Sequence, residues 1–385
     1  MSAAGSKAEP REYFVPGRIE LVGKHVDYAG GRSLTIATEL ALRARATMIA
    51  EPVIRVRRGA GEVAMDVALS PDARATTVRS SAYVTAVARR FARDFPRARR
   101  GVSIELQSDL PTSAGLSSST ALVVTLAMAF VDANDLENDG RWRAAVPTQM
   151  AFAEYVAAIE TGEAYGDFAR DGGVGVRGGA QDHVAIVCAA EGMVSQFSYL
   201  PPRLERRVSW PEEYVLAIAV SGVHATKTGN AKAAYNRLAD AMRTEDRGPK
   251  TEVVSAAVQE RREQFREETE VIVPGVGDAI RDRDFAKIGA LVQRSQELAE
   301  RVLGNQVPET IHLARSAREH GAVAASAFGA GFGGAVWAMV PRAAADVFVA
   351  AWRADYERVF PMRRVRAKWA ATRPAGAARR VGRVE

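Results

Sequence analysis

The stretch SDLPTSAGLSSSTALVVTLAMAF, Ser108–Phe130, runs from a strand through a proline and a glycine into three serines and a long apolar segment. The segment Leu116–Asn134 is almost wholly apolar, which predicts a buried helix. The first turn of a helix has about four backbone N–H groups without intrahelical partners, and the helix dipole adds positive charge there. This arrangement favours the binding of an anion such as phosphate.

The residues at this helix start are typical of a phosphate-binding loop rather than of an ordinary helix cap. Gly115 lets the backbone approach a phosphate closely, and Leu116 follows it. Ser117, Ser118 and Ser119 supply three hydroxyls where a cap needs one, and one of them could ligate magnesium. The loop is not a Walker loop, because no lysine follows a glycine at the required spacing.

A second polar cluster lies near the start of the chain, in PGRIELVGKHVDYAGG, Pro16–Gly31. Apolar residues along its first half predict a strand. Polar side chains at the end of a buried strand must be paired or must meet a ligand. Several of them come almost together here: Arg18, Lys24, His25, Asp27 and Tyr28.

The composition is that of an ordinary globular protein. The 385 residues, 47% of them hydrophobic and 25% charged, suffice for two domains or one large domain. Residues 1–10 lack the apolar centre of a signal peptide and predict a flexible tail. No apolar run approaches the roughly 20 residues that span a bilayer, so no membrane partner is expected. With Cys188 as the single cysteine, no intramolecular disulfide is possible, which favours a cytoplasmic location.

The net charge of +6 and the pI of about 9.5 come from arginines spread along the chain. No helix-turn-helix, zinc-finger or RNA-binding signature accompanies them, so no nucleic-acid partner is expected. A basic surface also attracts anionic small molecules. We expect a monomer or a weak homodimer.

The order of the predicted elements indicates an α+β fold with largely antiparallel sheets, because strands and helices are mixed without regular strand–helix–strand alternation. A helix is expected at Lys227–Arg243 and a strand around Val184–Ala189. The polar, proline-bearing segment Pro201–Pro211 is the candidate boundary between two domains, at 11–205 and 206–385.

Five blocks in the right order resemble motifs of the GHMP small-molecule kinases, and of their galactokinase branch in particular. PGRIELVGKHVDYAGG resembles the signature PGRxNLIGEHTDYxxG, and LPTSAGLSSSTAL resembles the phosphate loop P-x-x-x-G-L-S-S-S-A. SAFGAGFGGAVWAMV resembles T-G-x-G-F-G-G, GGAQDHVAI resembles the GIMDQ segment, and SQELAERVLGNQVPE resembles a later region. The similarity extends from about Tyr13 to Ala378.

The resemblance implies a two-domain GHMP kinase fold with the active site in the cleft between the domains. ATP would lie on the loop Gly115–Ser119, and Ser117 or Ser118 would contact phosphate and Mg²⁺. The second metal ligand in these kinases is a glutamate on the following helix. Glu160 is the first candidate for it, then Glu154, and then Glu163.

Asp182 matches the catalytic aspartate of the family, and Arg18 matches the arginine beside it. Phosphoryl transfer to a hydroxyl needs in-line placement and neutralisation of charge on the phosphoryl oxygens. A carboxylate can accept the hydroxyl proton as transfer proceeds. An adjacent guanidinium keeps that carboxylate ionised and stabilises developing negative charge. The resemblance therefore implies that Asp182 is the base and that Arg18 assists it.

The sugar would be held by residues at the other motif positions. His25, Asp27 and Tyr235 match positions that bind sugar hydroxyls in galactokinases, and Gly179 is expected beside the substrate. Such a site discriminates strongly, because a missing hydroxyl leaves buried polar groups unpaired. The implied reaction is ATP-dependent phosphorylation of the anomeric C1 hydroxyl of a monosaccharide.

The chain departs from the galactokinase pattern at several positions. Lys24 stands where galactokinases have a glutamate that faces the C6 hydroxyl of the sugar. An ammonium there would pair with the carboxylate of a hexuronic acid, and VRGGAQDHVAI is also similar to plant galacturonate kinases. Alternatively, Lys24 pairs with a protein carboxylate and a galactose-like sugar binds. His183 replaces a glutamine and Thr120 an alanine.

Two other functions stay open from the sequence. One is another GHMP small-molecule kinase, against which the HVDY segment argues. The other is a non-catalytic sugar sensor, since some galactokinase relatives bind their ligand without turnover. Such sensors tend to be altered in the serine loop or at the aspartate, and both are intact in this chain.

Overall fold

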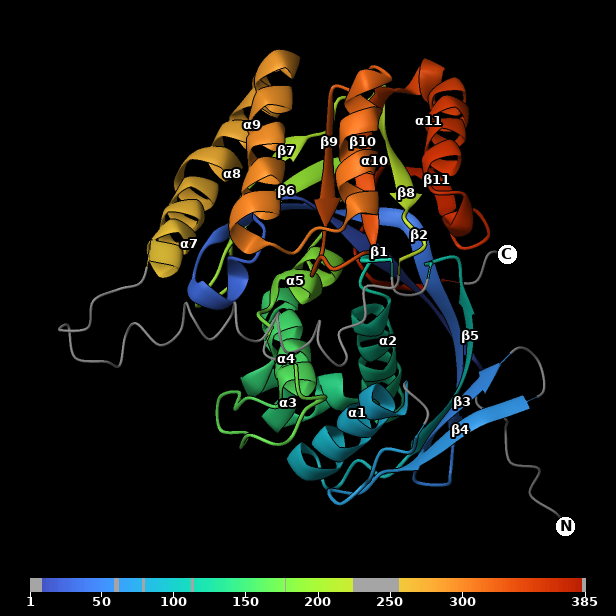
Figure 1. The fold of residues 1–385 in the computed structure, drawn as a ribbon. Coiled ribbons are helices and arrows are strands. Elements are labelled where there is room, and N and C mark those ends of the chain that lie inside the picture. The colour runs from blue at the N-terminus through green and yellow to red at the C-terminus, as the bar shows by residue number, and fades with distance from the viewer. Residues whose placement is uncertain are drawn as a thin grey trace, which may run out of the picture.

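The computed structural model describes residues 9–58, 62–77, 80–111, 114–176, 178–223 and 256–382 (Figure 1). These residues form two sheets with helices packed on both. In the first half the helices are α1 (Ser81–Asp94), α2 (Ser118–Ala133), α3 (Gly140–Ala145), α4 (Gln149–Thr161) and α5 (Gln181–Val187). In the second half they are α7 (Ala256–Glu267), α8 (Val273–Asp282), α9 (Phe285–Leu298), α10 (Pro308–Glu319) and α11 (Ala345–Val359).

The larger sheet contains a central path of strands in the order β13-β1-β2-β5-β3-β4, with β6, β7 and β12 joined to it through β2. Its pairs are antiparallel except for the parallel pair β3 and β5. The strands are β1 (Arg11–Val22), β2 (Arg32–Ile49), β3 (Val53–Arg58), β4 (Glu62–Ala68), β5 (Gly101–Ser108), β6 (Met193–Ser198), β7 (Arg203–Ser209), β12 (Pro374–Ala375) and β13 (Arg379–Val381).

The smaller sheet is antiparallel throughout, in the order β11-β8-β10-β9. Its strands are β8 (Tyr214–Val220), β9 (Ala324–Phe328), β10 (Ala335–Pro341) and β11 (Lys368–Thr372). Figure 1 shows α1 to α5 gathered within the curve of the larger sheet, and α10 and α11 beside the smaller sheet. The expected α+β class with mostly antiparallel sheets is therefore confirmed.

The domain division expected between residues 205 and 206 falls inside β7, which pairs with β6 along the larger sheet. The chain also returns to that sheet at its far end, where β13 pairs with β1 and β12 pairs with β2. The sequence analysis placed the domain boundary in this segment because it is polar and contains prolines. In the structure, Arg203–Ser209 is an edge strand of the larger sheet. The larger sheet therefore contains strands from both ends of the described chain.

One expected strand is a helix. The apolar run in Val184–Ala189 is too short for its periodicity to distinguish the two, and the structure places it in α5. This change puts Asp182 in the first turn of a helix. The expected helix Lys227–Arg243 lies outside the described residues.

The helix predicted from the opening stretch is α2, and most of its side chains are buried. It packs in the largest hydrophobic core with a cluster of aromatic rings from α1, α3 and α4. Phe91 stands at the centre of that cluster, with ring centroids 4.5 Å from Phe130 and 5.6 Å from Tyr155. This packing fixes α2, and hence the loop that precedes it, against the sheet.

A glycine in β1 allows this loop to approach the strand. A Cβ at Gly17 would lie 2.6 Å from a methyl group of Leu110 and 2.9 Å from the carbonyl oxygen of Leu116. The next backbone amide, that of Arg18, donates to the same Leu116 carbonyl at 3.3 Å. The loop and the strand are therefore in contact with no room for a side chain.

Gly17→Ala is expected to destabilise the protein by about 1–3 kcal/mol, because the added methyl overpacks a closed contact. Urea unfolding monitored by circular dichroism measures the change. Gly140→Ala is the matched control: no atom lies within 4 Å of its Cβ position, so its effect should stay below about 1 kcal/mol. Equal stability of the two variants would contradict the close contact.

Candidate active site

Three chain segments meet around the side chain of Arg18. The arginine lies in the middle of β1 and is 4% exposed. Its guanidinium donates to the carbonyl oxygen of Gly115 in the loop before α2. Gly329, in the loop after β9, lies against the same place, since a Cβ there would be 3.2 Å from the Gly115 oxygen. Both glycines have positive φ angles, +81° and +79°, which side-chain-bearing residues rarely adopt.

Arg18 forms an ion pair with Asp182 at the start of α5. Its Nε and a terminal nitrogen lie 2.8 Å and 2.7 Å from Oδ1 of the aspartate. Ser117 donates its hydroxyl to the other carboxylate oxygen at 2.7 Å. Burial lowers the pKa of Arg18, but the charges of Asp182 and Glu20 outweigh it and raise that pKa above the ordinary value. The structure therefore brings together the two residues expected to carry the chemistry.

The phosphate-loop residues lie where α2 begins. Ser117 precedes the first residue of the helix, with a left-handed φ of +57°. Ser118 and Ser119 occupy the first turn and are half-buried, while Leu116 is buried. The first backbone hydrogen bond of the helix runs from the amide of Ala121 to the carbonyl of Ser117. The amides before Ala121 therefore have no acceptor within the helix and can donate to a ligand. That geometry suits an anion.

A cavity opens beside the Arg18–Asp182 pair. Among the described residues, four carboxylates line it: Glu20, Asp27, Glu160 and Asp182. Arg18 is the described lining residue with a permanent positive charge, and His25, His183 and Gln181 add further polar groups. An uncharged polar ligand with many hydroxyl groups matches this lining.

His25 and Asp27 are both buried at this cavity. The ring of His25 lies 3.2 Å from the hydroxyl of Tyr28 and 3.1 Å from the carbonyl of Ala330. Asp27 lies against Gly179, where a Cβ would be 2.4 Å from its Oδ2. Gly179 is therefore required for the position of that carboxylate. Tyr235, also expected at the sugar, lies outside the described residues.

The three glutamates considered as metal ligands differ in position. Glu160 is 4% exposed, lines the cavity, and its Oε2 lies 3.2 Å from the hydroxyl of Thr120 and 3.1 Å from Nε2 of His183. Glu163 forms an exposed ion pair with Arg170. Glu154 is half-buried on α4, and burial raises its pKa. Of these three, Glu160 alone lines the cavity within the described part of the chain.

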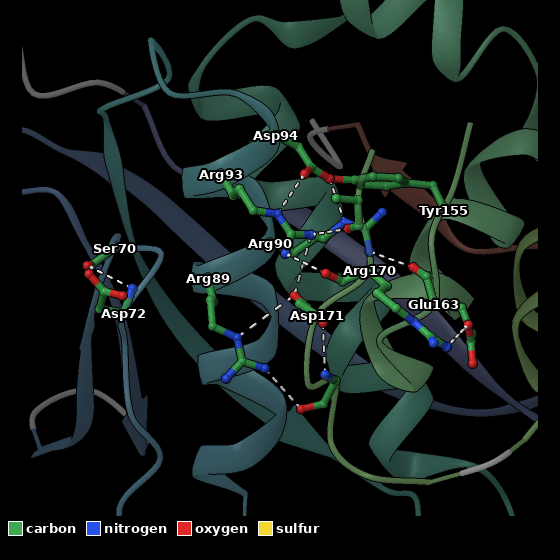
Figure 2. A network of polar contacts seen from close by, with 12 residues as sticks. Ser70, Asp72, Arg89, Arg90, Arg93, Asp94, Tyr155, Glu163, Arg170 and Asp171 are labelled. Carbon is green, nitrogen blue, oxygen red and sulfur yellow. Dashed lines mark hydrogen bonds and ion pairs between the residues drawn. The ribbon is translucent and has the colours of Figure 1, made fainter. Parts of the chain in front are cut away.

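Arginines of α1 hold the loop that follows Glu160 (Figure 2). Arg90 donates to the carbonyl of Glu163 at 2.9 Å, Arg93 donates to that of Ala169 at 2.6 Å, and Arg89 donates to that of Gly173 at 3.1 Å. Beyond these contacts, the amide of Val174 donates to the carbonyl of Glu160 at 2.9 Å. The network fixes residues 163–174, the first part of the long interval between Glu160 and Asp182.

For Lys24 the sequence left two partners open, a carboxylate of the substrate or a carboxylate of the protein. Its ammonium donates to the hydroxyl of Ser295 at 2.9 Å, and it is not among the described residues that line the cavity. Burial lowers the pKa of Lys24, and the carboxylates of Glu268 and Glu20 oppose this. The ammonium therefore acts as a counter-charge for protein carboxylates, because the turn after Gly23 directs it into the second half of the chain.

The sequence analysis did not predict two buried polar residues that line the cavity, Glu20 and Gln181. Glu20 is 3% exposed, and Gln181 donates its side-chain amide to Oε2 of that glutamate. The galactokinase signature has asparagine where this chain has Glu20, so the comparison of motifs contained a signal that a charge had been introduced. Burial raises the pKa of Glu20 to about 7, against the charges of Lys24 and Arg18, which lower it.

With this geometry established, comparison with known proteins defines the class. The N-terminal domain of GHMP kinases matches residues 82–190, and the C-terminal domain of these kinases matches residues 278–358. The galactokinase galactose-binding signature matches residues 2–47. The chain belongs to the GHMP kinase superfamily, as the motifs predicted.

Within that superfamily the chain is similar to galactokinases. The galactokinase of Streptomyces coelicolor is 32% identical over 157 residues, 39% of each chain, and that of Actinobacillus pleuropneumoniae is 27% identical over 113 residues, 29% of each. The sequence match thus spans well under half the length of these relatives. The crystal structure of Lactococcus lactis galactokinase complexed with galactose superimposes with a TM-score of 0.77 at 18% identity, covering 98% of this chain and 97% of that one.

The fold is shared more widely than the sequence. The mevalonate kinase of L. major, crystallised with R-mevalonate, superimposes with a TM-score of 0.63 at 14% identity, covering 98% of this chain and all of the other. Among the described residues, no helix is long and apolar enough to cross a membrane.

Glu20 is expected to make stability fall as the pH rises from 4.5 to 7. Its pKa is 4.5 in the reference state and about 7 in the folded protein, so in this interval the folded state binds more protons than the unfolded state. The free energy of unfolding should decrease by up to about 3 kcal/mol across the interval. Urea unfolding at pH 5 and pH 7.5 measures this decrease, and Glu20→Gln should reduce it. An equal decrease in the variant would exclude Glu20 as the source.

Proposed function

We propose that this protein is an ATP-dependent sugar 1-kinase, which phosphorylates the anomeric C1 hydroxyl of a galactose-like monosaccharide. The contact of Asp182 with both Arg18 and Ser117, where α2 begins, carries the proposal. The carboxylate of Asp182 lies beside a permanent positive charge, and in this proposal the terminal phosphate of ATP binds next to it. The galactose-binding signature over residues 2–47 supports a sugar as the acceptor.

In this proposal Asp182 accepts the proton of the sugar hydroxyl as the phosphoryl group is transferred. The ion pair with Arg18 keeps the carboxylate ionised, which a base requires. The guanidinium also lies near the point where negative charge develops on the transferred group. The amides and hydroxyls at the start of α2 hold the phosphates of ATP, and Ser117 links that start to the base.

Mg²⁺ fits the residues that are present. No group of three or more His, Cys, Asp or Glu side chains in the described ranges could hold a metal alone. Mg²⁺ in kinases is usually held by one or two protein ligands together with phosphate oxygens and waters. Glu160 and a serine of the loop, Ser117 or Ser118, would hold it. When bound, the ion would neutralise charge on the ATP phosphates.

A hexuronic acid is the alternative acceptor that the sequence raised. The residue that suggested it, Lys24, donates to Ser295 instead, so a galactose-like sugar is preferred. A non-catalytic sugar sensor of the same fold would bind the sugar and release no ADP. Measurement of ADP release with galactose, galacturonate, glucuronate and arabinose distinguishes these functions.

Asp182→Asn should lower kcat by about 10³-fold or more, because the amide cannot accept the hydroxyl proton. ATP binding, measured by calorimetry, should persist. Asp346→Asn, on the exposed start of α11, is the matched control and should retain full activity. Undiminished turnover by Asp182→Asn would show that another group is the base.

A further inference from the structure

Two hydrogen-bond acceptors on residues that line the cavity have no partner within the described part of the chain. Oε1 of Glu20 and the side-chain oxygen of Gln181 are buried and make no hydrogen bond within the described residues. Both residues line the cavity, at 3% and 5% exposure. A buried acceptor without a donor costs about 1–3 kcal/mol, and a ligand in the cavity that supplied the donors would remove this cost.

The two side chains form one unit. Gln181 donates its amide group to Oε2 of Glu20, and this bond uses the donor side of the amide. The oxygen of Gln181 therefore remains as a second acceptor without a partner among the described residues, in addition to Oε1 of Glu20. The unit also adjoins the base, since Asp182 follows Gln181 directly in α5.

The charges of the described residues around this unit disfavour an anion. Three other carboxylates line the same cavity in the described structure, and Arg18, which lines it too, is paired with Asp182. Lys24 attracts Glu20 from the protein side, where its ammonium donates to Ser295. A carboxylate brought by a ligand would have no hydrogen to donate and would meet like charges.

We propose that Glu20 and Gln181 contact the substrate directly and determine its class: they accept hydrogen bonds from a donor-bearing substituent, a hydroxyl group, and they reject a carboxylate. The inference rests on the proposed sugar kinase activity and assigns its specificity to residues outside the expected set. A sugar hydroxyl can donate to the Glu20 oxygen while it accepts from water or from another side chain. A substrate that places a carboxylate at this position leaves both acceptors unpaired.

Glu20→Gln, assayed at pH 8, where Glu20 with its pKa of about 7 is ionised, tests the proposal, because it keeps the shape and removes the charge. In the unmodified protein, kcat/KM for galactose should exceed that for galacturonate by about 100-fold or more. In Glu20→Gln this ratio should fall by at least about tenfold, mainly through a higher KM for galactose with a smaller change in kcat. Gln181→Met removes the second acceptor and should also lower the ratio of kcat/KM for galactose to kcat/KM for galacturonate.

Lys24→Met tests whether Lys24, rather than Glu20 and Gln181, determines the choice between a neutral sugar and a uronic acid. If the ammonium contacted a substrate carboxylate, this variant would lose activity on galacturonate selectively; we expect the preference for galactose to persist. Circular dichroism and urea unfolding establish that each variant is folded. Galactosamine is a further test ligand, because its amino group is a hydrogen-bond donor. If it binds more strongly than galactose, and Glu20→Gln weakens this binding, the result also supports a contact between Glu20 and a donor.

Calorimetric binding of the same sugars separates this inference from the proposed activity. Binding of galactose but not galacturonate, without ADP release, would overturn the kinase proposal and leave the selectivity intact. ADP release with galacturonate preferred over galactose would overturn the selectivity and leave the kinase intact. If the ratio of kcat/KM for galactose to that for galacturonate is unchanged in a folded Glu20→Gln protein, the proposed role of Glu20 in selectivity is also overturned.

Discussion

The ion pair between buried Arg18 and half-buried Asp182 is the interaction on which the site depends. It joins β1 to α5 across 164 residues of sequence, and the same guanidinium donates to Gly115 in the loop before α2. Removal of one partner from a buried pair costs about 3–5 kcal/mol, because the other charge stays behind. One cation therefore constrains a strand, a helix start and a glycine loop to a single arrangement.

Behind the cavity, a second set of buried polar contacts holds the turn that follows β1. Glu268 accepts the amide of Gly23 at 2.7 Å, and Arg261 donates to the carbonyl of His25 at 2.5 Å. His25 has a φ of +57°, which is unusual for a residue with a side chain. Residues from the second half of the chain thus stabilise a strained turn in the first half and orient the cavity side chains.

The features predicted correctly were those that the backbone or the hydrophobic pattern dictates. The apolar run after Ser117 specified a buried helix, and the motif order specified the class. The direction of Lys24 could not be predicted, because it depends on Ser295, which lies far along the chain. The segment after Asp182 was too short for periodicity to separate helix from strand, and nothing in the pattern around Glu20 showed that its side chain would line the cavity.

The pairing of β13 with β1 has a consequence for biosynthesis. Residues 12–14 hydrogen-bond with residues 379–381, so this edge of the larger sheet stays open until nearly the whole described chain has left the ribosome. An open edge offers unpaired backbone groups to other chains. Production of a truncated chain that ends before β12 would therefore create an aggregation hazard, even though none of the proposed catalytic groups would be missing.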